Sequence, residues 1–463
     1  MEKRDSEKRI TRRDFIGGMT AAAAAFTILP SGLRAGENSR TSGTLSPSDR
    51  LNIAVVGVGG MGRSNLKAVS DTENITALCD VDENLASDVF GHFPKAARYW
   101  DFRDMMDKEH RNIDAVIIAT PDHTHAVAAM AAMQMNKHVY VQKPLTRLIS
   151  EARKLAQAAK RYGVKAQMGN QHHSEEPIRL IAEMMADGAI GPIREVHLWT
   201  NRPVWLQGVA ERPAGMPRPD GLDWDLWCGP SPMREYNPVY HPFAWRGWWD
   251  FGTGALGDMG CHFIDPTYFA LKLTKPTAME ASVAALVDPK EIWEKVDNRE
   301  TFPSGSIVTF EFPARESMPP VRLIWYDGGL KPPRPEELEP GRNLPVNGSL
   351  YIGEKGKILH DLDGAAPRII PEEKMRAYTM PAKTIPRITT SHEMNWVNAC
   401  KGIGDLSSPF DYAGPLAEST LAGNLAVRFP WQRLEWDAEA MRVTNFDDAN
   451  EYVEPHYRQG YSL

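Results

Sequence analysis

The chain has 463 residues, a size that at roughly 100–200 residues per domain predicts two or three domains, each with its own core. Apolar residues make up 42% and charged residues 24%, as in ordinary globular proteins, which excludes a disordered or fibrous chain. The formal net charge of −7 argues against a nucleic-acid partner. The 4 cysteines lie far apart without a CxxC pair, so neither a zinc site nor a disulfide framework is indicated.

The N-terminal segment, residues 1–35, contains the basic KRITRRDFIGG, which continues into the apolar MTAAAAAFTILPSGL. A basic head before an apolar stretch too short to span a bilayer stably is typical of a secretory signal, and Arg12 and Arg13 indicate the twin-arginine kind. A fortuitous basic amphipathic helix is the alternative. We expect a bacterial protein that is exported to the periplasm, is cleaved near Ala35, and has no stable membrane anchor.

A glycine-rich turn follows in LNIAVVGVGGMGRSNLKAV, whose pattern predicts a buried strand, a tight turn and a helix. In a GxGxxG motif the first glycine allows the turn, the second admits a pyrophosphate, and the third lets the helix pack on the strand. The phosphates would then lie at the N-terminus of the helix. The residues of this predicted cradle are Gly57, Gly59, Gly60, Met61 and Gly62.

A second strand, ITALCD, ends in Asp80, 18 residues after Gly62. An acid at this distance accepts hydrogen bonds from ribose hydroxyls and repels a 2′-phosphate, so NAD is favoured over NADP. In the alternative interpretation, Asp80 and Asp82 are only the solvated end of a strand.

Three more strands are predicted at 114–121, 137–144 and 165–170, and they alternate with helical patterns. This alternation indicates parallel βαβ units, in which ligands gather at the carboxyl ends of the strands. The residues at such ends that we expect to contact the cofactor are Thr120, Pro121, His125 and Lys143.

The motifs GVGGMG, ATPDHTHA and QKPL, together with GDMGCHFID at 257–265, resemble the glucose-fructose oxidoreductase, inositol dehydrogenase and MocA-like family. The resemblance covers nearly the whole chain after the signal. It implies an α/β fold: an N-terminal Rossmann domain with a doubly wound parallel sheet, and a C-terminal α/β domain with a large, mostly antiparallel open sheet that covers the nicotinamide. The expected segments are a linker at 36–50, an NAD-binding domain at 51–170, a substrate and oligomerisation domain at 171–445, and a tail at 446–463.

The resemblance also implies roles for single residues. The catalytic lysine of the family matches Lys143, its helix aspartate matches Asp258, and its histidine matches His262. Trp245 and Arg246 match a pair that lies against the cofactor. One departure is that Gln142 replaces the glutamate common before this lysine, which removes a carboxylate that would hold Lys143 charged.

The chemistry of these residues suits oxidation of a secondary alcohol, in which the cofactor carries the hydride and the protein handles the proton. His262 is the candidate base, because a histidine side chain in general has a reference pKa of about 6.5 and can accept a proton at working pH. Asp258, one turn earlier, would hold the His262 tautomer or anchor a second hydroxyl, and Lys143 would stabilise a developing alkoxide. The alternatives are a solvated lysine and a local Asp–His hydrogen bond. Pro266 is expected to bend or restart this helix.

Seven of the 13 tryptophans lie between residues 199 and 249, among charged and amide side chains. Aromatic faces with nearby polar groups are what a sugar site needs, although a core role is the alternative for each ring. For the adjacent His172 and His173, a polar pocket wall is favoured over a metal site, and no metal is expected. The predicted substrate contacts are Asn170, His172, Asn201, Arg202, Trp205 and Trp249.

We therefore expect an NAD-dependent oxidoreductase that acts on a sugar, a glycoside or a cyclic polyol, in a homodimer or homotetramer. Because free NAD is not expected in the periplasm, one alternative is a redox-assisted glycosidase with tightly bound, internally recycled NAD. Another is a non-catalytic sugar-binding relative. The helical SHEMNWVNACKG is assigned to the second domain, and the terminal EPHYRQGYSL is expected to contact a neighbouring subunit.

Overall fold

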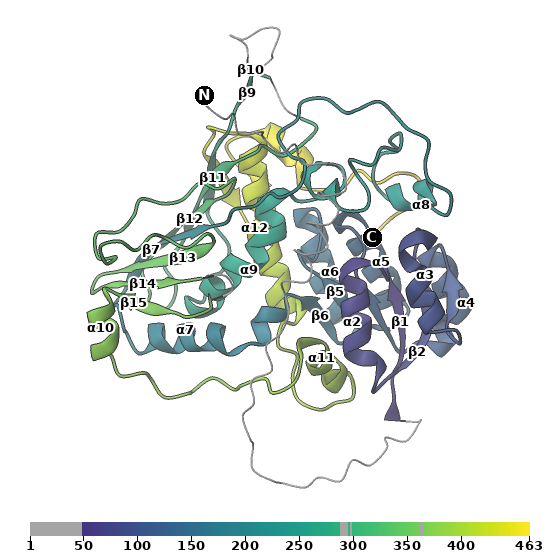
Figure 1. Ribbon diagram of the computed structural model, residues 1–463, viewed down its shortest axis with the longest axis horizontal. Helices are drawn as coiled ribbons and strands as arrows, with labels where there is room; N and C mark the ends of the chain where they lie inside the picture. Colours follow the sequence, from purple (N-terminus) through teal and green to yellow (C-terminus); the bar gives the residue numbers. More distant parts are fainter. Residues whose placement is uncertain (1–48, 288–294, 297–298, 362–363) are drawn as a thin grey trace, which may run out of the picture. The chain divides into compact units, whose positions relative to one another are not determined.

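The computed structural model describes residues 49–287, 295–296, 299–361 and 364–463 (Figure 1). The expected signal segment lies outside the described residues. The first sheet has six parallel strands in the order β3-β2-β1-β4-β5-β6, which confirms the doubly wound arrangement. Its strands are β1 (Asn52–Val56), β2 (Asn74–Cys79), β3 (Ala97–Tyr99), β4 (Ala115–Ile118), β5 (His138–Gln142) and β6 (Ala166–Gly169).

Helices cover both faces of this sheet, so its strands β1, β4, β5 and β6 bury residues on both sides. On β1, Ala54 and Val56 belong to one core cluster, whereas Ile53 and Val55 belong to another. The connecting helices are α2 (Gly60–Ser70), α3 (Glu83–His92), α4 (Phe102–Glu109), α5 (Asp122–Gln134) and α6 (Ile149–Tyr162). The glycine-rich turn and the residue Lys143 both follow carboxyl ends of strands in this sheet.

The second sheet has nine strands in the order β15-β14-β13-β7-β12-β11-β8-β16-β17. Only the β7–β12 pair is parallel, which confirms the mostly antiparallel sheet. Its strands are β7 (Ile193–Trp199), β8 (Ala278–Val283), β11 (Ser306–Phe312), β12 (Val321–Tyr326), β13 (Gly348–Gly353), β14 (Lys357–His360), β15 (Arg368–Ile370), β16 (Leu434–Asp437) and β17 (Arg442–Val443). The short strands β9 (Leu286–Val287) and β10 (Lys295–Val296) pair separately.

Two long helices, α9 (Gly254–Ala270) and α12 (Phe410–Arg428), pack on each other, and α12 contacts strands of both sheets. Pro266 lies inside α9, and the helix continues through it rather than restarting. Proline there removes a single N–H, the one that would bond the carbonyl of His262, and burial of the surrounding turn keeps the rest of the helix in place. The remaining helices are η3 (Gln171–Ser174), α7 (Glu176–Ala186), α8 (Trp224–Cys228), η4 (Ala244–Gly247), α10 (Glu372–Ala377), α11 (His392–Cys400) and η6 (Asp447–Tyr452), with the short η2 (His110–Asn112) after α4.

One helix packs on a different sheet from the one that its place in the sequence predicted. The helix α11, assigned above to the second domain, packs on the first sheet, where Trp396 and Val397 share a core with Ile53 and Tyr140. No periodicity within nine residues can tell which sheet a helix will cover.

Among the described residues, no helix is long and apolar enough to cross a membrane.

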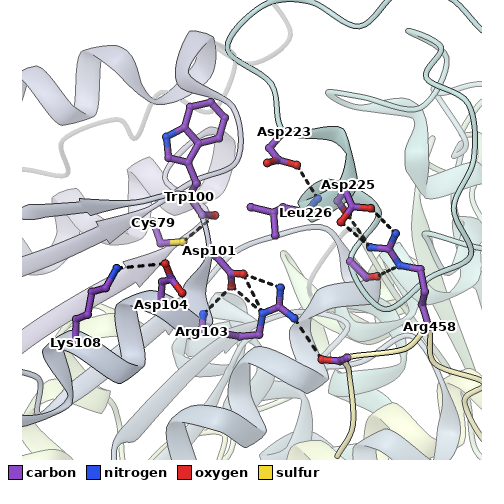
Figure 2. Close-up of polar contacts among 12 residues, drawn as sticks. Cys79, Trp100, Asp101, Arg103, Asp104, Lys108, Asp223, Asp225, Leu226 and Arg458 are labelled. Carbon is purple, nitrogen blue, oxygen red and sulfur yellow. Dashed lines mark hydrogen bonds and ion pairs between the residues drawn. The ribbon is translucent and has the colours of Figure 1, made fainter.

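The C-terminal tail contacts this same chain. Figure 2 shows Arg458 pointing toward Asp225 of α8, with Nη1 2.7 Å from Oδ1. Arg103 of α4, which is held by Asp101, donates to the carbonyl of Gly460 at 3.3 Å. The tail therefore joins α8 to α4 within one subunit, and the expected contact with a neighbouring subunit stays a prediction.

Candidate active site

The glycine-rich turn between β1 and α2 has no room for side chains at its first and third glycines. A Cβ on Gly57, whose φ is +81°, would lie 2.8 Å from the carbonyl carbon of Ala119. A Cβ on Gly62 would lie 1.8 Å from the carbonyl oxygen of Gly57. Backbone of the turn, the strand and the helix therefore meet in close contact, as a dinucleotide cradle requires.

The N-terminus of α2 fits a pyrophosphate. Its N-cap Gly59 makes no side-chain cap, and the first turn carries no acidic residue, so no side chain of the helix itself occupies the N–H groups at the positive end of its dipole. Asp80 accepts from the N–H groups of Val58 at 2.8 Å and Gly59 at 3.3 Å. The N–H group of Asp82 donates to the other oxygen of Asp80 at 3.0 Å. A carboxylate has about four acceptor sites, so Asp80 retains about one of them for a ribose hydroxyl. The residues present thus fit NAD.

A contact that the sequence did not predict covers the end of β2. Asp82, which caps α3, lies with Oδ2 2.7 Å from Nε2 of His241, a residue 159 positions later. Leu222 forms a backbone bridge with Asp82, and the N–H of Asp223 donates to the carbonyl of Val81 at 2.8 Å. The tryptophan-rich segment therefore docks on the edge of the sheet where the adenosine ribose would bind. In the sequence, the one sign of this contact was a second acidic residue, Asp82, in the CDVD string at the end of the strand.

Lys143 lies directly after β5 and reaches helix α9 of the other half. Its Nζ donates to Oδ1 of Asp258 at 2.8 Å and to the backbone oxygen of the same residue at 3.1 Å. Arg246, which stacks at 4.3 Å on the ring of Trp245, donates from Nε to the same Oδ1 at 3.2 Å. The structure therefore brings together three predicted residues from β5, η4 and α9.

The charge of Asp258 is set by these two cations. Burial alone would raise the pKa of the Asp258 carboxyl, but Lys143, Arg246 and His262 together hold it well below its usual range. The side chains of Lys143 and Asp258 are 19% and 13% exposed, so solvent screens the pair only weakly. Asp258 is thus a permanent anion that orients Lys143, a role that the spacing with His262 alone did not indicate.

His262 lies one turn after Asp258 on α9. Its ring meets that of His172 edge to face, with centroids 5.6 Å apart. His172 belongs to η3, directly after the last strand of the first sheet, and lies 3.2 Å from Glu175. The predicted substrate contact His172 therefore lies beside the predicted base.

A buried carboxyl that the sequence reasoning missed stands near this group. Asp122, in the first turn of α5, is 4% exposed and accepts from the hydroxyl of Thr253 at 2.7 Å. Burial raises the pKa of Asp122 to about 7, although Arg246 and Lys143 act against the rise.

Nearby, His125 lies with Nε2 2.8 Å from the carbonyl oxygen of Thr120, and burial lowers the pKa of His125 to about 4. His125 thus supports the turn at Thr120 as a neutral ring.

The adjacent histidines point to different partners. Nδ1 of His173 lies 2.9 Å from Asp265, which also accepts from Nδ2 of Asn170 at 2.9 Å and from the hydroxyl of Tyr412. Asn170 is 1% exposed and is therefore committed to this buried group rather than to an open substrate surface. Among the residues that the structure describes, no group of three metal-ligating side chains occurs.

Most of the tryptophans between residues 199 and 249 form core, the alternative considered above for each ring. Four of these rings share one buried cluster with Tyr240 and Phe251, and Trp199 is fully buried. Tryptophan side chains gain stability when they pack against one another and exclude water. The sequence does not show which rings will pack together in this way. The four clustered rings are Trp224, Trp227, Trp245 and Trp248.

The remaining predicted substrate contacts differ in exposure. Trp249 stacks on Phe302 with centroids 3.5 Å apart, and Arg428 lies 4.9 Å from its ring, so little of either face is open. Trp205 is 9% exposed and donates from Nε1 to Gln207. Asn201 is exposed and accepts from Arg202 at 2.7 Å. A cavity of about 690 Å³ lies beside Trp249 and Arg428, and neither Lys143 nor Asp258 lines it.

The two halves of the chain each match a model of a known protein family. Residues 51–170 match the family model GFO_IDH_MocA, described as an oxidoreductase family with an NAD-binding Rossmann fold. Residues 197–305 match its partner model, the C-terminal alpha/beta domain of the oxidoreductase family. The predicted NAD cofactor is therefore confirmed at the level of the family.

The similar proteins include curated relatives and solved structures. A levoglucosan dehydrogenase from Pseudarthrobacter phenanthrenivorans is 26% identical over 46% of this chain and 50% of its own length. A glycosyl hydrolase family 109 protein from Shewanella pealeana is 26% identical over 40% of this chain and 44% of its own. The chain thus spans about half the length of the curated relatives it matches.

Among solved structures, the WlbA dehydrogenase from Bordetella pertussis, in complex with NADH and UDP-GlcNAcA, superposes with a TM-score of 0.57. It is 17% identical, with 84% of this chain and 99% of that chain covered. This likeness shows the shared fold of both halves. With both domain models matched in order along its length, the chain belongs to the GFO/IDH/MocA oxidoreductase family.

Proposed function

We propose that the protein is an NAD-dependent oxidoreductase that transfers hydride between the nicotinamide and a secondary alcohol of a sugar, a glycoside or a cyclic polyol. The observation that carries this proposal is the convergence of Lys143, Arg246 and Asp258 across the two halves, beside His262. The names of the relatives, which include a levoglucosan dehydrogenase and inositol 2-dehydrogenases, support a carbohydrate or polyol substrate.

Lys143 binds the reacting oxygen in this proposal. An ammonium group has about three N–H donors, and Asp258 accepts two of them through its carboxylate and its backbone oxygen. The third donor is left for the alcohol oxygen, where the fixed positive charge stabilises the alkoxide as it develops. Because Asp258 holds Nζ from two directions, this charge is oriented before the substrate arrives.

His262 accepts the alcohol proton. The anion of Asp258, one turn away, stabilises the imidazolium that results, and His172 packs against the same ring. The bound nicotinamide supplies the hydride acceptor for oxidation, or the donor for the reverse reaction. Asn201 and Arg202 are the remaining candidates for contacts with further hydroxyls.

We also propose that NAD stays bound between turnovers. The docking of residues 221–223 and His241 on the end of β2 supports this, since it would have to open for the adenosine half to leave. A retained cofactor suits the twin-arginine export proposed from residues 1–35, because that route carries folded proteins to a periplasm without free NAD. Changing Arg12 and Arg13 to lysine should leave the protein in the cytoplasmic fraction.

A second candidate function is redox-assisted cleavage of a glycoside. Transient oxidation of a ring carbinol to a ketone acidifies the neighbouring C–H, the aglycone leaves by elimination, water adds, and the hydride returns to the sugar. The similarity to a glycosyl hydrolase family 109 protein and the covered ribose edge favour this candidate over a non-catalytic sugar binder.

One experiment separates these functions. The purified protein is denatured to identify the released nucleotide, and the intact holoprotein is then mixed with levoglucosan, myo-inositol and nitrophenyl glycosides. A lasting rise in nicotinamide absorbance supports the oxidoreductase, whereas nitrophenol release without that rise supports the second candidate. Sugar binding with a silent nicotinamide and no cleavage would reject both. Light scattering on the same sample tests the proposed homodimer or homotetramer.

A further inference from the structure

A buried chain of side-chain amides ends on the carboxylate of Glu393, in the first turn of α11. Nε2 of Gln142 donates to Oδ1 of Asn65 at 2.9 Å, and Nδ2 of Asn65 donates to Oε1 of Glu393 at 2.8 Å. Asn65 is fully buried, Gln142 is 5% exposed, and Glu393 is 7% exposed. This hydrogen-bond chain joins α2, which carries the cradle, to Gln142, the last residue of β5 and the neighbour of Lys143.

Two more neutral donors converge on the same oxygen of Glu393. The hydroxyl of Tyr140 and Nε2 of Gln171 each lie 3.3 Å from Oε1. Burial and the adjacent Glu393 raise the pKa of Tyr140 well above its usual value, so this phenol stays a donor. Within the described part of the chain, no lysine or arginine forms an ion pair with Glu393. The positive end of the α11 dipole offsets part of its burial cost.

The direction of the chain follows from its two ends. An ionised carboxylate only accepts, so Glu393 fixes Asn65 with its NH₂ group toward α11 and its Oδ1 toward β5. The residue at position 142 must then donate, and a glutamine does so. A glutamate at 142 would place a carboxylate oxygen against Oδ1 of Asn65. Two buried acceptors would then be in contact with no hydrogen between them. One carboxylate fits this chain, at 142 or at 393, but not at both.

We infer that Glu393 is a positioning residue of the proposed active site. Glu393 lies 251 residues after Gln142, and its carboxylate ends, through Asn65, the hydrogen-bond chain that begins at the residue next to Lys143. Successive residues at the end of a strand point to opposite sides, so Gln142 is fixed behind the sheet while Lys143 reaches Asp258 in front. Through Gln171, the same carboxylate reaches the short helix that carries His172.

The inference rests on the proposed function only in that Lys143 is taken to act in the reaction. Its test measures NAD⁺ binding and thermal unfolding and needs no carbohydrate. The full-length variants Gln142→Glu, Glu393→Gln and the double exchange are titrated with NAD⁺ after removal of bound nucleotide, and their thermal unfolding is recorded. Gln142→Glu breaks the bond to Asn65 of α2, the helix that carries the cradle. We therefore expect it to weaken NAD⁺ binding about tenfold or more and to lower the melting temperature, as the loss of a buried hydrogen bond does. Glu393→Gln alone should cost less, because an amide oxygen still accepts from Asn65.

The double exchange is the decisive variant. It restores the bonds between positions 142, 65 and 393 in the opposite direction, with Asn65 turned over between a glutamate at 142 and a glutamine at 393. Tyr140 and Gln171, which donate to Oε1 in the wild type, must then turn to accept from the new NH₂ group or to bond elsewhere. NAD⁺ affinity and melting temperature should therefore rise well above those of Gln142→Glu and toward those of the wild type. If Gln142→Glu alone is not recovered in soluble form, recovery of soluble protein in the double exchange counts as the same rescue. A double exchange no better than Gln142→Glu would overturn the inference.

Gln167 provides a matched control. It is a fully buried glutamine on the neighbouring strand β6, and its Nε2 donates to the backbone oxygen of His392 on α11 at 2.8 Å. Gln167→Glu should destabilise the protein for the same local reason, but Glu393→Gln should not rescue it. Rescue of both glutamate variants would show a general effect of removing negative charge and would also overturn the inference. Because both readouts are independent of turnover, they also distinguish this outcome from failure of the proposed reaction.

Discussion

Replacing Asp258 by asparagine removes the charge between Lys143 and Arg246 and keeps the shape of the site. Both cations bond the same Oδ1, which an asparagine retains, so the hydrogen bonds can persist. At the 2.8 Å separation from Lys143 and an effective dielectric constant of about 20, the lost attraction is about 6 kcal/mol. Much of this is offset by desolvation of the wild-type pair, and breaking buried pairs costs about 3–5 kcal/mol.

We therefore expect Asp258→Asn to lower the free energy of unfolding at neutral pH by about 3 kcal/mol. The two cations hold the pKa of Asp258 below its unfolded value, so the stability that this carboxylate contributes is present above about pH 4 and is lost as the pH falls below it. The difference between wild type and variant should accordingly shrink in acid. Urea unfolding from neutral to acidic pH, followed by tryptophan fluorescence, measures it.

The exposed pair Asp104–Lys108, visible in Figure 2, is the control. These side chains are 63% and 62% exposed, so Asp104→Asn should change stability by less than about 1 kcal/mol. If Asp258→Asn behaves like Asp104→Asn, or keeps a constant difference from wild type at every pH, then Asp258 is not the clamped anion described here.

Further outcomes follow from the same geometry. Lys143→Met should reduce turnover about 10²- to 10³-fold with NAD⁺ affinity little changed, as measured by stopped-flow absorbance and titration. Asp122→Asn should gain stability over wild type as pH rises from about 4 to about 7 and should keep that gain above pH 7, because burial raises that carboxyl's pKa to about 7 and its ionisation costs stability; equal pH profiles would contradict this. Gly62→Ala should weaken NAD⁺ binding about 10- to 100-fold in fluorescence titrations, since its Cβ would overlap backbone. His241→Ala should speed NAD⁺ release about tenfold by freeing Asp82, and an unchanged dissociation rate would reject the proposed closure.

Local pattern was sufficient for the first half of the fold. The apolar run before Gly57, the glycine spacing and the alternation of strands with helices predicted the parallel sheet, because these signals report hydrogen-bond direction and burial within short windows. The mostly antiparallel second sheet and the placing of Lys143 and Asp258 in one site came from the family resemblance. No composition or spacing links residues 115 positions apart.

The sequence by itself determined which chemistry is available: an NAD cradle, an ammonium group, and a carboxylate one helical turn from an imidazole. Only the tertiary structure decided what each group faces. It turned Asp258 toward Lys143 and Arg246, buried four of the seven tryptophans in a shared core, and brought Glu393 behind Gln142. The physical reason is that burial and hydrogen-bond partners are supplied by distant elements, so a side chain's charge, orientation and exposure are properties of the packed chain rather than of its neighbours in sequence.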